Sequence, residues 1–118
     1  MGSGIIERGD VVLAVYPFTD LSSAKRRPAL VVSATDRSDR DCILAFITSH
    51  IEKDGETDLL LDAQDASFAD TGLRTSSLVR CGKLMTLNRT LLTGRLGKLD
   101  ARLMAEVNRR LMKALELE

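Results

Sequence analysis

Short apolar runs separated by polar stretches make up most of the chain before residue 90. Most runs are about four to eight residues long and rich in Val, Ile and Leu, which is typical of buried strands. They predict strands over residues 11–16, 29–34, 42–48, 57–61 and 77–87. Gly82 interrupts the last run, and a glycine there indicates a bulge or bend that would let a sheet curl.

The polar stretches between the runs predict loops and one short helix. Residues 19–26 form a polar connection into the strand at 29–34. Residues 64–69 are rich in alanine and have helical character that stops at Gly72. Short strands, tight connections and one bent long strand together favour a small closed or half-closed barrel.

The C-terminal segment has a different period. Apolar residues recur there every four positions, at Leu99, Leu103, Val107, Leu111 and Leu115. This spacing predicts an amphipathic helix, with Asp100 as its N-cap and a hydrophobic staple between Leu99 and Met104. The fold class is therefore mainly β with α: a barrel of about five to seven strands followed by one helix.

A chain of 118 residues is one domain long. We assign residues 5–118 to this domain and interpret residues 1–4 (Met-Gly-Ser-Gly) as the remnant of an expression tag. No stretch has the pattern of a signal peptide or is apolar for long enough to span a bilayer. Cys42 and Cys81 both lie in apolar runs, which favours two buried thiols over a disulfide. Reduced thiols in turn indicate a cytoplasmic location.

The net charge is zero, but the charges are segregated along the chain. Residues 36–70 hold ten acidic side chains against three basic ones, whereas residues 71–113 hold ten basic against two acidic. The basic half could fold into a face that attracts an anionic polymer, or the two halves could neutralise each other on a mixed surface. Aromatic residues are only 3% of the chain and Trp is absent, which argues against an aromatic platform for stacking bases.

Several chemistries find little support in the sequence. A metal site has little support, because the chain has one histidine, its two cysteines are far apart in the sequence, and no acidic residues or histidines have the spacing of metal ligands. The sequence also lacks a glycine-rich loop of the kind that binds the phosphates of a cofactor. The polar residues at strand ends remain as candidates: Arg27, Thr48, Ser49, His50, Arg80 and Lys83.

Arg27 is the most informative of these candidates. Pro28 fixes its own φ angle and drives Arg27 towards an extended conformation, so the guanidinium would sit on a rigid edge. A planar, always charged donor held in one place suits phosphate recognition. The alternative is that Arg27 only extends its charge into solvent at the barrel rim.

Five blocks of the sequence follow one another in a distinctive order. They are Gly9-Asp10-Val11-Val12, Arg26-Arg27-Pro28-Ala29-Leu30-Val31-Val32-Ser33, Ile47-Thr48-Ser49, Ser77-Leu78-Val79-Arg80 and the helix lead-in Gly94-Arg95-Leu96-Gly97-Lys98-Leu99. Together they resemble the MazF/PemK family of toxins from toxin–antitoxin pairs, in a match that runs in order from residue 9 to about residue 115.

The resemblance implies an SH3-like barrel, a homodimer and a metal-independent endoribonuclease that cuts single-stranded RNA at short sequences. In such enzymes the ribose 2′-hydroxyl attacks the neighbouring phosphate, which leaves a cyclic phosphate and a free 5′-hydroxyl. Carried over to this chain, Arg27 would stabilise the phosphorane and help protonate the leaving oxygen, while Thr48 would orient the phosphate. The resemblance also implies a cognate antitoxin that lies across the RNA groove.

The general base is not assigned by the resemblance. Some members have an acidic residue where this chain has Gly82, and others have Glu in the loop before the arginine, where Asp20 is the nearest acid here. Asp20 and His50 are the candidates, with Ser49 as a further RNA contact, although each could be an ordinary loop residue. Further RNA contacts are expected at Lys25, Arg26, Arg80 and Lys83.

Structural roles compete with two of these assignments. Arg80 could instead be a partner in an ion pair, and the Thr48 hydroxyl could close a hydrogen bond in its loop. Two other functions also remain open. A CcdB-like toxin with this fold would act by binding DNA gyrase, and a degenerate family member, favoured by Gly82, would bind RNA or antitoxin without cutting.

Overall fold

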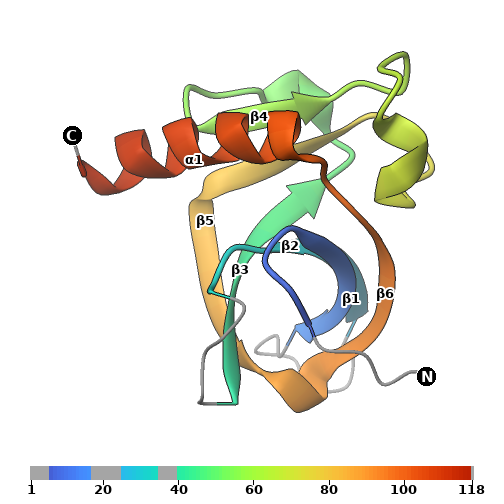
Figure 1. Cartoon of the computed structure of the whole chain (residues 1–118), viewed down its shortest axis with the longest axis vertical. Coiled ribbons are helices and arrows are strands. Elements are labelled where there is room, and N and C mark those ends of the chain that lie inside the picture. The colour runs from blue at the N-terminus through green and yellow to red at the C-terminus, as the bar shows by residue number, and fades with distance from the viewer. Residues whose placement is uncertain (1–5, 17–24, 35–39, 118) are drawn as a thin grey trace.

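Six antiparallel strands and one helix form the architecture in the computed structural model, which describes residues 6–16, 25–34 and 40–117. The strands are β1 (Asp10–Tyr16), β2 (Lys25–Val31), β3 (Asp41–Thr48), β4 (Asp58–Leu61), β5 (Ser77–Asn88) and β6 (Leu92–Lys98). They form one sheet in the order β4-β5-β3-β2-β1-β6. The sheet curls without closing, and helix α1 (Ala101–Leu115) lies across one end of it, beside β4 and β5 (Figure 1). This confirms the predicted fold class.

A bulge bends β5 at the predicted glycine. Ala45 of β3 lies opposite Leu84, but the next residue, Phe46, lies opposite Arg80, so residues 81–83 have no partner on β3. An added Cβ at Gly82 would lie 2.8 Å from the Thr57 Oγ1 atom. The bend directs the first half of β5 towards β4 and the helix (Figure 1), while both halves stay paired with β3.

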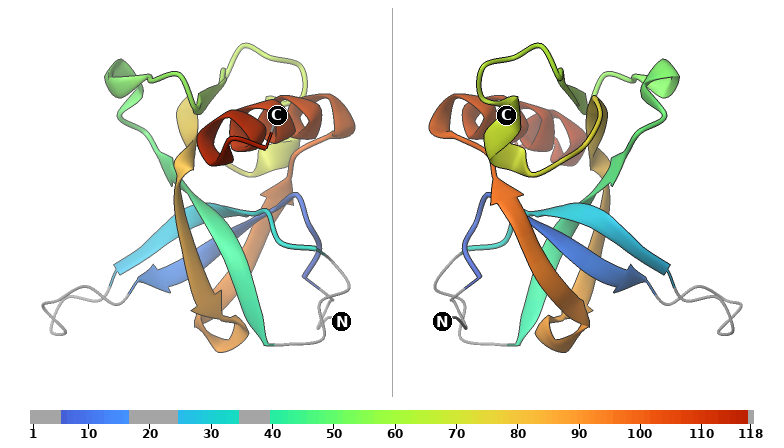
Figure 2. Two further views of the ribbon diagram at one scale, coloured as in Figure 1. Left: turned by 90° about the vertical axis from the view of Figure 1, so that its left-hand side faces the viewer. Right: turned by 90° about the vertical axis from the view of Figure 1, so that its right-hand side faces the viewer.

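The sheet also splits between β2 and β3. Their pairing runs from Val31 opposite Leu44 to Ala29 opposite Phe46 and goes no further. The next residue of β2 is Pro28, which has no amide hydrogen to donate. Beyond this point β2 stays paired with β1 while β3 stays paired with β5, and the two pairs diverge (Figure 2). The result is a fork in the sheet.

Two apolar clusters lie on opposite faces of the strands. The helix-side cluster packs α1 against the sheet and contains Val11, Leu30, Ala45, Ile47, Leu59, Leu61, Val79, Cys81, Leu99, Leu103 and Val107. The inner cluster lies within the curl and contains Val12, Ala14, Tyr16, Ala29, Val31, Cys42, Leu44 and Leu87. Successive residues of β1 and β2 alternate between the clusters because side chains alternate along a strand.

Short 3-10 helices fill three of the connections: η2 (Ile51–Lys53), η3 (Phe68–Thr71) and η4 (Arg89–Leu91). The η3 turn ends at Gly72, which has φ 75°, and it lies against β6. An added Cβ at Gly72 would overlap the carbonyl of Leu96, and one at Gly97 would overlap the carbonyl of Asp70. Two glycines therefore let backbone pack on backbone between the β4–β5 connection and β6.

The helix begins as predicted. Asp100 is the N-cap, and its Oδ1 atom accepts a hydrogen bond from the Leu103 amide at 2.9 Å. Its other oxygen, Oδ2, accepts from the Ser67 hydroxyl at 2.5 Å. No helix in the described ranges is both long and apolar enough to cross a membrane.

Three predicted elements differ from the structure. Residues 92–98 form β6 instead of a lead-in to the helix, and the polar, largely exposed sequence of this edge strand has no apolar alternation to reveal it. Strand β2 begins at Lys25 and ends at Val31, rather than spanning 29–34, because pairing with β1 extends to Tyr16 opposite Lys25. Helical structure near 64–69 is confined to the single turn of η3.

Candidate active site

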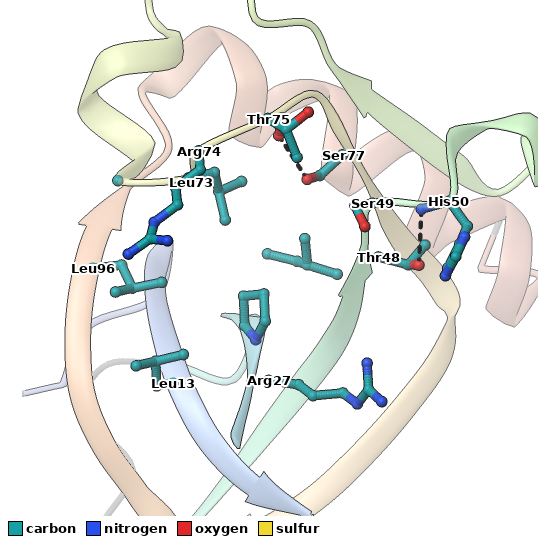
Figure 3. Close-up of a pocket in the computed structure, with 13 residues that line it drawn as sticks. Leu13, Arg27, Thr48, Ser49, His50, Leu73, Arg74, Thr75, Ser77 and Leu96 are labelled. Atoms are coloured by element: carbon teal, nitrogen blue, oxygen red, sulfur yellow. Dashed lines mark hydrogen bonds between the residues drawn. The ribbon is translucent and has the colours of Figure 1, made fainter. Parts of the chain in front are cut away.

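A groove that encloses about 380 Å³ opens at the fork between β2 and β3 (Figure 3). Apolar side chains form much of its wall: Leu13, Pro28, Ile47, Leu73 and Leu96. Polar residues complete the lining: Arg27, Thr48, Ser49, His50, Arg74, Thr75 and Ser77, with Gly72 at one edge. The groove therefore joins residues from five strands or their connections.

Arg27 and Thr48 occupy the two sides of the fork. Continued two residues past its last pair, the β2–β3 register would place Arg27 opposite Thr48. Because side chains alternate, both residues belong to the sheet face of Ala29 and Phe46, and Pro28 and Ile47 point to the other face. Figure 3 shows the guanidinium of Arg27 extending towards the side of the groove where Thr48 and His50 lie.

The Thr48 hydroxyl is held by its own loop. Its Oγ1 atom accepts a hydrogen bond from the His50 amide at 3.1 Å. A hydroxyl that accepts in this way still has its hydrogen to donate. Thr48 is therefore oriented by the loop and able to donate to a phosphate oxygen.

An aromatic pair supports the Arg27 side of the fork from the inner cluster. The ring centroids of Tyr16 and Phe46 lie 4.5 Å apart with an interplanar angle of 47°. Burial raises the pKa of Tyr16 well above its usual value, and the nearby charge of Arg27 opposes part of this shift. Arg27 itself is exposed and makes no ion pair with any carboxylate among the described residues, so its charge is available to a ligand.

The structure brings Ser49 and His50 to the same groove. Both are exposed, and His50 Nδ1 lies 3.6 Å from the Glu52 carboxylate. Of the described side chains that line the groove, none is a carboxylate, so His50 is the one of general-base type. Asp20, the other candidate base, lies outside the described residues.

The other predicted RNA contacts lie outside the groove lining. Lys25 and Arg26 are exposed at the start of β2, and Lys83 is exposed in the bulge of β5. Arg80 lies next to Phe46 in register, but its Nε atom is 3.5 Å from the carboxylate of Asp58, whose side chain is only 4% exposed. This geometry favours a role for Arg80 as the ion-pair partner of Asp58 over a role as an RNA contact.

Ion pairs join some charges of the acidic segment 36–70 to charges of the basic segment 71–113. Arg102 contacts Asp65, and Lys113 contacts Glu56, in addition to the Arg80–Asp58 pair. Arg109 and Arg110 both contact Glu106 within α1. These pairs neutralise part of the opposite charges of the two segments, and the arginines that line the groove are Arg27 and Arg74.

Arg74 is a groove residue that the sequence analysis missed. It lies in the connection from η3 to β5, far from Arg27 along the chain, and Figure 3 shows its side chain near Leu96, across the groove from Thr48 and His50. The one feature of the sequence that pointed to it is its place two residues after Gly72, where the short helix was predicted to end. Nothing local in the sequence placed that connection against the fork.

Neither metal-binding groups nor a disulfide accompany the groove. Among residues whose positions the structure describes, no three His, Cys, Asp or Glu side chains are grouped to hold a metal ion. Cys42 and Cys81 are both free and buried, in the inner and the helix-side cluster respectively. The polar side chains that line the groove carry guanidinium, hydroxyl and imidazole groups.

Proteins of known sequence and structure resemble this chain in both its sequence and its fold. The Endoribonuclease MazF2 of Mycobacterium bovis and the Endoribonuclease MazF6 of Mycobacterium tuberculosis are each 31% identical to the chain over 114 residues. Each alignment covers 96% of this chain and 99% of the relative. Among solved structures, a MazE-MazF complex from Deinococcus radiodurans matches with a TM-score of 0.78 and 20% identity, over 98% of this chain and 100% of that chain.

A further solved structure, an endoribonuclease in complex with its cognate antitoxin from a mycobacterial species, matches with a TM-score of 0.72 and 21% identity. It covers 96% of this chain and 97% of that chain. The sequence model of the PemK-like, MazF-like toxins matches residues 7–115, nearly the whole domain predicted at 5–118. The chain belongs to the PemK-like, MazF-like toxin family of type II toxin–antitoxin systems.

Proposed function

We propose that the chain is the toxin of a toxin–antitoxin pair and that it acts as a sequence-selective endoribonuclease on single-stranded RNA. The observation that carries this proposal is the placement of Arg27 and Thr48 on the two sides of one groove, in a chain of this family. Relatives 31% identical over nearly the full length are named endoribonucleases, which supports the activity. Solved relatives in complex with an antitoxin support an antitoxin as partner.

The reaction we propose needs no metal ion. The ribose 2′-oxygen forms a bond to the adjacent phosphorus and the bond to the 5′-oxygen breaks, which leaves a cyclic phosphate and a 5′-hydroxyl. His50 or Asp20 takes the proton of the attacking hydroxyl, and the leaving 5′-oxygen takes a proton from water with the help of Arg27. Arg27 donates to the phosphoryl oxygens as their charge grows, and Thr48 donates its remaining hydrogen to the same group.

Binding of the RNA strand extends beyond the two reacting groups in this proposal. Lys25 and Arg26 are exposed beside Arg27 and suit backbone phosphates. Lys83 has a similar exposed position on β5, and Arg80 would contribute only if its pair with Asp58 opened. We also propose that the protein is a homodimer and acts in the cytoplasm, as the family assignment suggests.

A cleavage assay in the presence of chelator tests the mechanism. The purified protein is incubated with a long RNA, and the new ends are analysed for cyclic phosphate and 5′-hydroxyl groups. We expect Arg27→Ala to reduce the rate about 100- to 1,000-fold, the cost of losing one preorganised donor to a developing charge. Arg109→Ala, an exposed arginine of α1, is the control and should cut at the normal rate.

A second candidate function is RNA or antitoxin binding without cleavage. The lack of a carboxylate among the described groove residues and the glycine at position 82 favour it. Tight RNA binding with no new RNA ends would support this function over the nuclease. Inhibition of DNA gyrase that survives Arg27→Ala would instead support the CcdB-like function.

A further inference from the structure

We propose that the groove is a pocket for one nucleobase next to the cleaved phosphate, and that Arg74 is the residue that selects this base. The inference rests on the proposed nuclease function and adds the identity of the base and of the residue that recognises it. Guanine is the base that fits the donors of the pocket best.

The position of Arg74 is fixed by the contact between η3 and β6. Gly72 has a left-handed backbone and lies directly against the carbonyl of Leu96, and Gly97 lies against the carbonyl of Asp70. The connection that carries Arg74 is thus supported by backbone packing just before it leaves for β5. A side chain on such a connection is better positioned than one on a free loop.

The walls of the groove suit the flat face of a base. Leu13, Pro28, Ile47, Leu73 and Leu96 are apolar, and the enclosed volume of about 380 Å³ lies in the range of small-ligand pockets. Apolar contact above and below a ring supplies affinity without selecting a sequence. Selection must therefore come from the few polar groups that reach the edge of the ring.

Two of the polar groups in the groove already have partners within the protein. The Ser77 hydroxyl donates to the Thr75 carbonyl at 2.9 Å, and the Thr48 oxygen accepts from the His50 amide. Arg74 is exposed, and no carboxylate of the described residues pairs with it. It is therefore the strongest donor available to a ligand on the Leu96 side of the groove.

The fork between β2 and β3 allows one nucleotide to place its phosphate at Arg27 and Thr48 and its base near Arg74. Arg27 and Thr48 belong to one face of the sheet, whereas Pro28 and Ile47 belong to the other. Because β2 and β3 are not paired beyond Ala29, a phosphate at Arg27 and Thr48 can have its base directed between the strands into the groove. Arg74 would then meet the edge of that base.

Guanine follows from the geometry of a guanidinium. Its two parallel N–H groups match the O6 and N7 acceptors of guanine, which is the commonest specific contact between arginine and a base. Adenine presents an amino donor in place of O6 and would lose one of the two hydrogen bonds. The pocket should therefore prefer guanine over adenine by about 5- to 150-fold in cleavage or binding.

The test compares cleavage preferences on a randomised RNA pool, read by sequencing the new 5′-hydroxyl ends. We expect the wild-type protein to show a guanine preference at one position beside the cut. Arg74→Ala should flatten the preference at that position alone, and Arg74→Lys should reduce it, since lysine keeps the charge but lacks the two-pronged donor. Arg109→Ala is the matched control and should keep the wild-type preference.

The outcomes separate this inference from the proposed function. Cleavage with an unchanged base preference in both Arg74 variants would overturn the pocket assignment and leave the nuclease intact. Loss of the dimer mass in Arg74→Ala, with uniform loss of cutting, would also overturn it, because a second copy would then be the occupant of the groove. If the wild-type protein cuts no RNA, binding of oligonucleotides that differ only by guanine or adenine decides the inference: equal affinity for the two overturns it.

Discussion

The hydroxyl oxygen of Thr48 accepts a hydrogen bond from the backbone amide of His50 at 3.1 Å. This contact fixes the hydroxyl at the end of β3 and leaves its hydrogen for a ligand. Two roles were predicted for Thr48, a hydrogen bond within its loop and a contact with the phosphate. The same hydroxyl can do both, because it accepts from the loop and can still donate to a phosphate. A catalytic and a structural role therefore need not exclude each other here.

Substitutions of Thr48 should show whether cleavage depends on the shape of its side chain or on its hydroxyl group. Thr48→Val keeps the size of the side chain but removes the hydroxyl, and we expect cleavage to fall about 10- to 150-fold, the cost of a hydrogen bond to a charged group. Thr48→Ser keeps the hydroxyl and should stay within a few-fold of the wild type. Single-turnover cleavage rates measure both. Equal rates for the valine and serine variants would contradict the role of the hydroxyl.

Arg80 should matter more for stability than for RNA. Its Nε atom faces the buried carboxylate of Asp58, which also accepts a hydrogen bond from the Gly55 amide at 2.9 Å. Arg80→Ala would leave that carboxylate without its charge partner and should lower the free energy of unfolding by about 1–3 kcal/mol. Urea unfolding measures this loss, and a double-mutant cycle with Asp58→Ala isolates the pair.

Arg80→Ala also decides whether Arg80 binds RNA. If Arg80→Ala weakens RNA binding at low salt while its stability is unchanged, then the RNA-contact prediction holds and the structural reading fails. Lys83→Ala provides the comparison on the same strand, since Lys83 is exposed and should affect only binding.

The proton acceptor is testable by comparing His50 and Asp20. If His50 is the general base, His50→Gln should lower the cleavage rate about 100- to 10,000-fold. Asp20→Asn should then have little effect. The reverse result, with a large loss only in Asp20→Asn, would assign the role of general base to Asp20.

The sequence predicted those features that depend on local rules. The bulge at Gly82, the cap at Asp100 and the period of the helix all follow from short-range patterns, and the structure confirms them. Edge strand β6 escaped prediction because its sequence is polar, glycine-containing and mostly exposed. Its place in the sheet depends on pairing with β1, far away in the chain.

The site was predictable only in part for the same reason. Arg27 and Thr48 were singled out as polar residues at strand ends, the resemblance to a known family gave them roles, and both line the groove. Arg74 was missed because it reaches the groove through the packing of η3 on β6, which no local pattern encodes. Long-range contacts of backbone, rather than motifs, assemble this side of the site.

The thiol of Cys81 should be unreactive in the folded protein. Burial raises its pKa from 9.0 to about 11, with a smaller opposing effect from Arg110. The unfolded chain releases the thiol proton at lower pH than the folded one, so stability should fall as pH rises from 9 towards 11. Iodoacetamide at pH 8 should label the protein only in denaturant, and rapid native labelling of Cys81 would contradict its burial.

Two glycines of β6 offer a matched test of the contact that supports Arg74. A Cβ at Gly97 would overlap the backbone carbonyl of Asp70, whereas one at Gly94 would meet nothing within 4 Å. Gly97→Ala should therefore lower the free energy of unfolding by about 1–3 kcal/mol, since the backbone of η3 must move to make room. Gly94→Ala should change it by less than about 0.5 kcal/mol. Urea unfolding of the two variants measures both values, and equal stabilities would mean that η3 does not pack on β6 as closely as described.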